Sequence, residues 1–99
     1  MDNKSALIEE LQKTGHITLE QVARWKDLSE LLAVLDAIGN DGASVIMKVD
    51  GGRSDASVYT VVVSGGKLGE AFFRKDGPKL HELLYEAISF YEARVWARN

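Results

Sequence analysis

The chain has 99 residues, of which 45% are hydrophobic and 27% are charged, a composition typical of a globular domain and not of a disordered segment. It contains no cysteine, which excludes disulfides and thiolate chemistry and favours the reducing cytoplasm. No stretch resembles a secretory signal or a membrane span. We therefore expect one cytoplasmic domain over residues 1–99, with no membrane partner.

The net charge of −3 is unevenly distributed along the chain. Residues 1–42 carry eight acids against four bases, whereas residues 43–99 carry seven acids against eight bases. An acidic helical half can steer a basic partner toward it, although a solvated helix surface would give the same pattern. The acids that we assign to partner binding are Glu9, Glu10, Glu20, Glu30 and Asp36.

Helical spacing of apolar residues predicts a first helix over residues 3–13, ending before Gly15. A second helix should begin at Thr18, because Thr18 and Gln21 have the spacing of a capping box. Asp27 and Glu30 have the same spacing, so residues 18–38 form either one helix or two helices broken near residues 25–27. The apolar stripe of this stretch, which should end at Gly39, consists of Val22, Leu28, Leu31, Leu32, Leu35 and Ile38.

Alternating side chains predict three strands, over residues 44–49, 57–64 and 68–74, which form an antiparallel meander. Residues 50–57 should form a long hairpin loop and residues 64–67 a tight turn whose glycines adopt positive φ. Apolar residues fall on both sides of the middle strand, so we expect both faces of the sheet to be covered. The C-terminal helix would cover one face, and the N-terminal helices or a partner the other.

The last helix should run over residues 78–98, with Pro78 at its first position. Its core stripe consists of Leu80, Leu83, Leu84, Ala87, Ile88, Tyr91 and Val95. A second row lies about a third of a turn away and contains Tyr85, Ser89, Glu92 and Trp96. The fold class is therefore α+β, with N-terminal helices, a three-stranded antiparallel meander and a long C-terminal helix.

Catalytic and metal-binding motifs are missing from the sequence. The two histidines, His16 and His81, have no local partner arrangement typical of an active site, and without thiolates a transition-metal site would rest on carboxylates. We therefore expect a protein that is not an enzyme and holds no metal or organic cofactor.

Large aromatic residues are the remaining candidates for recognition. Tyr85 and Trp96 are candidate partner-binding residues because aromatic side chains are enriched at the centres of interfaces. The alternative is that their row packs beneath the N-terminal helices. Trp25, near the possible helix break, is expected to be a core anchor.

The order helix, three-stranded meander, helix over residues 19–97 resembles a double-stranded-RNA-binding domain. In that family a basic cluster at the start of the last helix binds phosphates, and Arg74, Lys75 and Lys79 occupy roughly that place. The family's Lys-Lys-x-Ala-Lys pattern is absent, and three bases are few for salt-dependent phosphate binding. Nucleic acid is therefore the alternative partner and not the expected one.

In size, acidity and lack of cysteine the chain resembles small bacterial and phage immunity or inhibitor proteins, such as those of contact-dependent growth inhibition. That resemblance implies a non-catalytic inhibitor that binds a toxin nuclease or another basic enzyme and blocks its basic cleft. Acidic helices would dock on the cleft, and the aromatics would supply the buried centre. A homodimer with a structural role is a further possibility.

Overall fold

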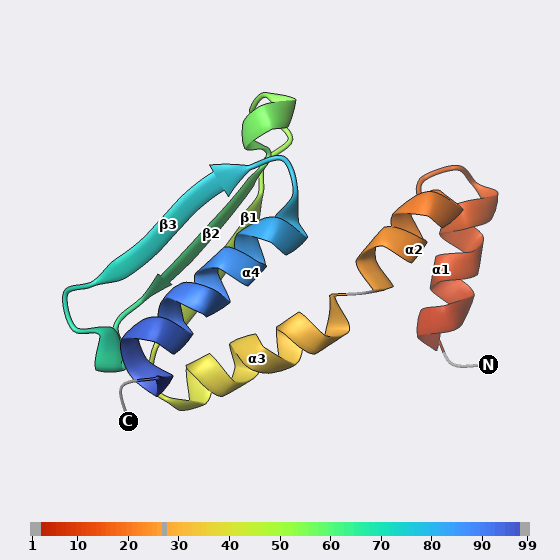
Figure 1. Cartoon of the computed structure of the whole chain (residues 1–99). Coiled ribbons are helices and arrows are strands. Elements are labelled where there is room, and N and C mark those ends of the chain that lie inside the picture. The colour runs from red at the N-terminus through yellow and green to blue at the C-terminus, as the bar shows by residue number, and fades with distance from the viewer. Residues whose placement is uncertain (1–2, 27, 98–99) are drawn as a thin grey trace.

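The computed structural model describes residues 3–26 and 28–97. Within these residues there are four α-helices and a three-stranded sheet, which confirms the α+β class (Figure 1). The helices are α1 (Asn3–Lys13), α2 (Leu19–Lys26), α3 (Ser29–Asn40) and α4 (Leu80–Tyr91). The strands are β1 (Ser44–Val49), β2 (Tyr59–Ser64) and β3 (Phe72–Gly77).

The sheet is an antiparallel meander in the order β1-β2-β3, with Val45 paired to Val63 and Val61 paired to Lys75. Helix α4 runs along one face of the sheet, and α3 lies beside α4 next to β1 (Figure 1). The core forms between these helices and this face, which buries Val61 and Val63 completely. Other buried members of the core are Leu28, Leu35, Ile38, Ala43, Leu68, Leu80, Leu83, Leu84, Ala87, Tyr91 and Val95.

The second face of the sheet is not covered by the N-terminal helices, so that part of the expectation is wrong. Ile46 and Phe72 lie on this face and are 56% and 63% exposed. Helices α1 and α2 lie to one side of the sheet and α4 instead of behind the sheet (Figure 1). Apolar residues on both sides of β2 therefore do not show that both faces of the sheet are covered.

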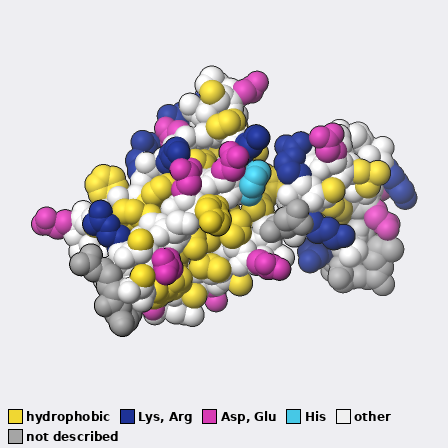
Figure 2. All heavy atoms as spheres, viewed as in Figure 1, with side chains coloured by type: hydrophobic (Ala, Val, Ile, Leu, Met, Phe, Trp, Pro, Cys, Tyr) yellow, Lys and Arg dark blue, Asp and Glu magenta, His cyan; other side chains and the backbone are white. Residues whose placement is uncertain are grey.

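Helices α1 and α2 form a hairpin, the α1–α2 arm (residues 3–26), that stands off the core. Neither helix contains a buried residue. The Cα radius of gyration is 15.8 Å, whereas a compact chain of this length has about 13 Å. Figure 2 shows the arm as a lobe beside the core. The arm thus contributes little to the core beside it.

The predicted N-terminal boundaries are confirmed. Helix α1 has the expected bounds, and Gly15 follows it with a φ of +82°. The backbone N–H of Gln21 donates to Oγ1 of Thr18 over 3.0 Å, and that of Thr18 donates to Oε1 of Gln21 over 2.8 Å. Residues 18–38, for which the sequence allowed one helix or two, contain two helices, α2 and α3. The second proposed capping box involves Asp27, which lies outside the described residues.

Other boundaries differ from the prediction in the α3–β1 and β2–β3 connections. Helix α3 continues past Gly39 to Asn40, and Gly42 after it has a positive φ. The turn after β2 is not tight, because a 3₁₀ turn over Gly66–Leu68 buries Leu68 and delays β3 until Phe72. Positive φ angles at Gly65, Gly66 and Gly69 make this path possible.

Helix α4 has the predicted core stripe but differs at both ends, and Pro78 lies before the helix and not at its first position. It begins at Leu80, with Lys79 as the N-cap residue, and is followed by a π-helical turn over Glu92–Trp96. The backbone N–H of Ala97 donates to the carbonyl of Glu92 over 2.7 Å, five residues back. This wider turn changes the phase of the helix, so Trp96 does not continue the row of Tyr85.

Candidate functional site

The five predicted acids do not form one surface. Glu9, Glu10 and Glu20 lie on the α1–α2 arm, where Glu20 forms an ion pair with Arg24 at 3.6 Å. Glu30 and Asp36 lie on α3, which carries no base. All five side chains are exposed, and the four bases of the arm offset its three acids. Of the two helical parts that carry these acids, α3 is therefore the one without a base in its own sequence.

The predicted basic cluster is separated by the sheet. Arg74 and Lys75 are neighbours within β3, so their side chains point to opposite faces. Nζ of Lys75 contacts both carboxylate oxygens of Glu86, at 2.8 and 3.0 Å. Arg74 lies on the uncovered face, 4.0 Å from Asp76. Only Lys79 stays at the start of α4, because β3 extends past the predicted strand end.

The two predicted aromatic residues have different surroundings. Tyr85 is 67% exposed and borders a groove of about 590 Å³ that also includes Leu31 and Lys75. Trp96 is half-buried and packs edge-on against Tyr91, with ring centres 5.1 Å apart. Tyr85 is thus the one of the two that faces solvent.

Asp41, which the sequence did not single out, joins the end of α3 to the C-terminal turn. Its Oδ2 accepts hydrogen bonds from the indole N–H of Trp96 at 2.7 Å and from the hydroxyl of Tyr91 at 3.0 Å. These two bonds, Trp96 first, hold the pKa of Asp41 below its usual value, with a smaller contribution from Lys67. Burial raises the pKa of Tyr91, and the hydrogen bond to Asp41 raises it further. The cluster is a structural clamp.

A second polar cluster holds the β1–β2 connection against the uncovered face of the sheet. The Thr60 hydroxyl donates to Oδ1 of Asp76 over 2.5 Å, and Arg53 donates to both residues at 3.1 and 3.3 Å. The bond from Thr60 is the main reason that the pKa of Asp76 is lowered, and Arg53 adds to it. Because its partners satisfy it, Thr60 can be buried.

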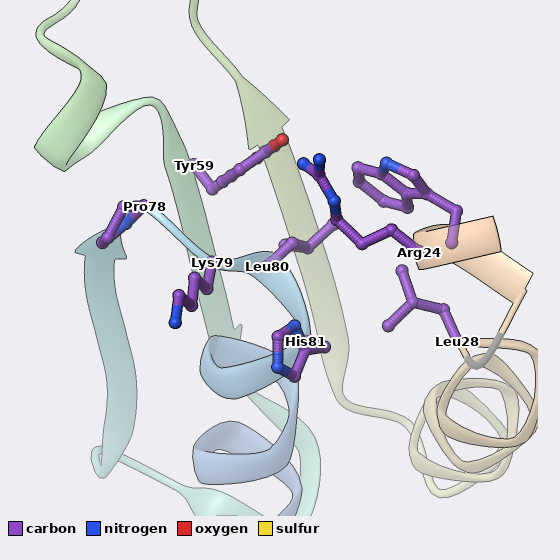
Figure 3. A pocket seen from close by; sticks show the side chains of 8 residues that line it. Arg24, Leu28, Tyr59, Pro78, Lys79, Leu80 and His81 are labelled. Carbon is purple, nitrogen blue, oxygen red and sulfur yellow. The ribbon is translucent and has the colours of Figure 1, made fainter. Parts of the chain in front are cut away.

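A pocket of about 270 Å³, the junction pocket, opens between α2 and the start of α4 (Figure 3). Its apolar walls are Trp25 and Leu28 on the helical side and Tyr59 and Leu80 on the core side. The ring of Trp25 meets the ring of Tyr59 edge-on, with centres 6.0 Å apart. Trp25 is 38% exposed, so it borders this pocket and is not the core anchor that the sequence suggested.

The two charged residues that line the junction pocket, Arg24 and Lys79, are both basic, and His81 lies beside them. Arg24 approaches from α2, whereas Lys79 and His81 come from the start of α4 (Figure 3). The pairing of Arg24 with Glu20 is an exposed i,i+4 contact, which costs little to break. Residues near position 24 and near position 80 are far apart in sequence, so only the fold brings them together.

A second apolar depression, the arm groove, lies on the α1–α2 arm itself. It has a volume of about 430 Å³ and is lined by Ile8, Ile17, Gln21, Val22, Trp25 and Lys26. Ile17 and Val22, which flank the capping box at the spacing of a hydrophobic staple, both border this groove. The apolar face that would pack on a core in a compact domain is here accessible from outside.

The two histidines lie apart. Nδ1 of His16 is 2.7 Å from the hydroxyl of Thr14 in the turn between α1 and α2, and His81 is exposed on α4. Among residues 3–26 and 28–97 there is no group of three or more His, Cys, Asp or Glu side chains that could hold a metal ion. Nor does this part of the chain contain a helix long and apolar enough to cross a membrane.

Comparisons of the chain with protein-family models, with curated proteins and with solved structures find no match.

Proposed function

We propose that this chain is a non-catalytic, protein-binding inhibitor that acts in the cytoplasm. In the form suggested by its likeness to immunity proteins, it neutralises a toxin nuclease by occupying the nuclease's basic cleft. The absence of cysteine fits a reducing compartment.

The observation that carries this proposal is the unpacked α1–α2 arm. A helix with an apolar stripe normally buries it against another element. Here Val22 and Ile8 border an open groove, Leu7 is 57% exposed, and no residue of the arm is buried. Exposed apolar surface of this kind marks sites of protein association in monomeric proteins. A partner that covers the arm groove would supply the missing packing.

Charge supports a basic partner on the neighbouring helix. Glu30 and Asp36 on α3 are exposed, and the described residues of α3 include no base that would neutralise them. Opposite charges across an interface speed association and fix the orientation of the partners. The arm would provide the apolar contact and α3 the electrostatic one.

Phosphate recognition receives no comparable support. Arg74 and Lys75 face opposite sides of the sheet, and Lys75 is already bound by Glu86. Of the predicted basic cluster only Lys79 stays at the start of α4, and one lysine is a small share of the charge that nucleic-acid binding requires.

The test is a titration of the protein encoded by the neighbouring upstream gene, which for an immunity protein is the toxin. The purified chain should abolish the nuclease activity of that protein, with a sharp end point at one chain per nuclease. An upstream product without nuclease activity, or one that stays active in the presence of excess chain, would contradict the proposal.

A matched pair of variants tests the role of the arm. Val22→Asn places an amide in the arm groove, whereas Ala23→Asn introduces the same amide side chain at the next position, which does not line the groove. Loss of a hot-spot contact costs about 2 kcal/mol, so Val22→Asn should weaken inhibition about 30-fold. Ala23→Asn should leave it nearly unchanged. Equal effects of the two variants would remove the arm groove from the interface.

A further inference from the structure

The junction pocket lies next to the arm groove, and the charged side chains that line it are opposite in sign to those of α3. We propose that it receives one large apolar side chain of the partner protein, flanked in the partner's sequence by Asp or Glu. This inference rests on the proposed function, because the occupant is a segment of the protein that the chain inhibits.

The size of the pocket favours a single side chain. Its volume of about 270 Å³ lies below the range of roughly 300–1,000 Å³ that is typical of small-molecule sites. Its walls are the aromatic rings of Trp25 and Tyr59 and the aliphatic side chains of Leu28 and Leu80. Rigid aromatic walls around a small apolar cavity are typical of sites that take a hot-spot residue.

The charge of the pocket specifies the flanks of that side chain. Arg24, Lys79 and His81 line the pocket, and no acid lines it. The first residues of α4 form part of the wall, so the positive end of the helix adds potential of the same sign. Acidic residues beside the anchor would meet these bases, whereas lysine or arginine there would be repelled.

The pocket also has a position that suits a partner covering the arm. One wall belongs to α2 and the other to the core, so an occupant contacts both the arm and the core (Figure 3). Trp25 borders both the junction pocket and the arm groove. A partner bound in the groove and in the pocket would therefore contact Trp25 from both.

Three capped pentapeptides test the pocket without the partner: Gly-Asp-Phe-Glu-Gly, Gly-Asn-Phe-Gln-Gly and Gly-Lys-Phe-Lys-Gly. Binding is followed by ¹H–¹⁵N NMR through the indole N–H of Trp25 and the amides of Leu80 and His81. The acidic peptide should shift these signals at about a tenfold lower concentration than the lysine peptide, with the neutral one between them. No shift, or shifts of equal midpoint for all three peptides, would overturn the inference.

The variant Arg24→Gln/Lys79→Gln should abolish the preference for the acidic peptide. The control Lys4→Gln/Lys48→Gln also removes two positive charges, one on the arm and one on the core, at positions that do not line the pocket. This control should retain the preference for the acidic peptide. An unchanged preference in the first variant, or its loss in the control, would overturn the assignment. So would 3-phenylpropionate binding as tightly as the acidic peptide, because the site would then be one for small molecules.

Failure here is distinguishable from failure of the proposed function. Both double variants are also titrated against the neighbouring nuclease. Inhibition that survives while the peptides fail to bind would refute the pocket and leave the inhibitor proposal standing.

Discussion

The indole N–H of Trp96 donates to Oδ2 of Asp41 over 2.7 Å, a contact between residues 55 positions apart in the chain. The hydroxyl of Tyr91 donates to the same oxygen. Together these bonds connect the last turn of the chain to the α3–β1 connection and close the core at that end. Donors aimed at an ionised carboxylate form stronger hydrogen bonds than they form with a neutral acceptor.

The clamp predicts a loss of stability in acid that can be assigned to Asp41. Its folded-state pKa is lowered from the ordinary value of 3.8, by Trp96 first and Tyr91 second. Its stabilising contribution is therefore complete above pH 3.8 and disappears as the pH falls through the lower folded value. Asp41→Asn should lower the melting temperature at neutral pH.

The difference in melting temperature between wild type and Asp41→Asn should shrink as the pH falls below 3.8 and through the lower folded-state pKa of Asp41. Asp50 and Asp76, whose pKa values are also lowered, titrate in both proteins and cancel in the comparison. Thermal melts of wild type and Asp41→Asn at a series of acidic pH values measure this difference in melting temperature. A difference that stays constant with pH would show that the charge of Asp41 plays no part.

Two adjacent glycines predict different costs for the same change. Gly65 and Gly66 both have positive φ, so alanine is strained at either position. A Cβ at Gly65 would meet nothing within 4 Å, whereas one at Gly66 would lie 2.8 Å from the backbone N of Ala43 and 2.8 Å from C of Gly42. Gly66→Ala should therefore lower the melting temperature clearly more than Gly65→Ala. Equal losses would mean that the turn after β2 does not pack against the α3–β1 connection.

The separation of arm and core predicts an unequal response to leucine truncation. Leu84 is fully buried, so Leu84→Ala should lower the free energy of unfolding by about 2–5 kcal/mol. Leu7 is more than half exposed on the arm, so Leu7→Ala should change it by no more than about 0.5 kcal/mol. Urea unfolding followed by the far-UV signal tests the pair. A comparable loss from Leu7→Ala would show that the arm is part of the cooperative core.

Sequence patterns predicted the fold well wherever local chemistry decides it. Gly15, the Thr18–Gln21 capping box and the stripe of α4 all depend on residues a few positions apart, and the structure agrees. The start of β3 could not be predicted, because a run of glycines allowed a 3₁₀ turn whose stability comes from burying Leu68. That burial depends on the tertiary structure.

The candidate site was harder to predict, for related physical reasons. An apolar stripe indicates that a helix has a face to bury but not what covers it, so the α1–α2 arm could not be distinguished from a packed hairpin. Trp96 does not lie in the same row as Tyr85, because the π turn over Glu92–Trp96 changes the phase of the helix. The junction pocket joins Arg24 to Lys79 across the fold. The clue to the pocket was Trp25, a large aromatic beside a helix break.

The acids of α3 predict a charge-dependent rate of association with the partner. Glu30→Lys/Asp36→Lys should slow the association and weaken its dependence on salt, because exposed charges are screened over about 10 Å at 0.1 M. Asp55→Lys/Glu70→Lys makes the same change in net charge at exposed positions outside α3 and serves as the control. Stopped-flow association at several salt concentrations measures both. Equal slowing by the two variants would indicate a general effect of net charge.

The most direct test of the account is hydrogen exchange of the α1–α2 arm, with and without the neighbouring nuclease. In the free chain the arm amides should exchange faster than those of β2 and α4, because no arm side chain is buried. Bound nuclease should slow exchange in α1 and α2 and leave β2 nearly unchanged. A tight complex in which the arm exchanges as fast as in the free chain would contradict the claim that the arm is the binding element.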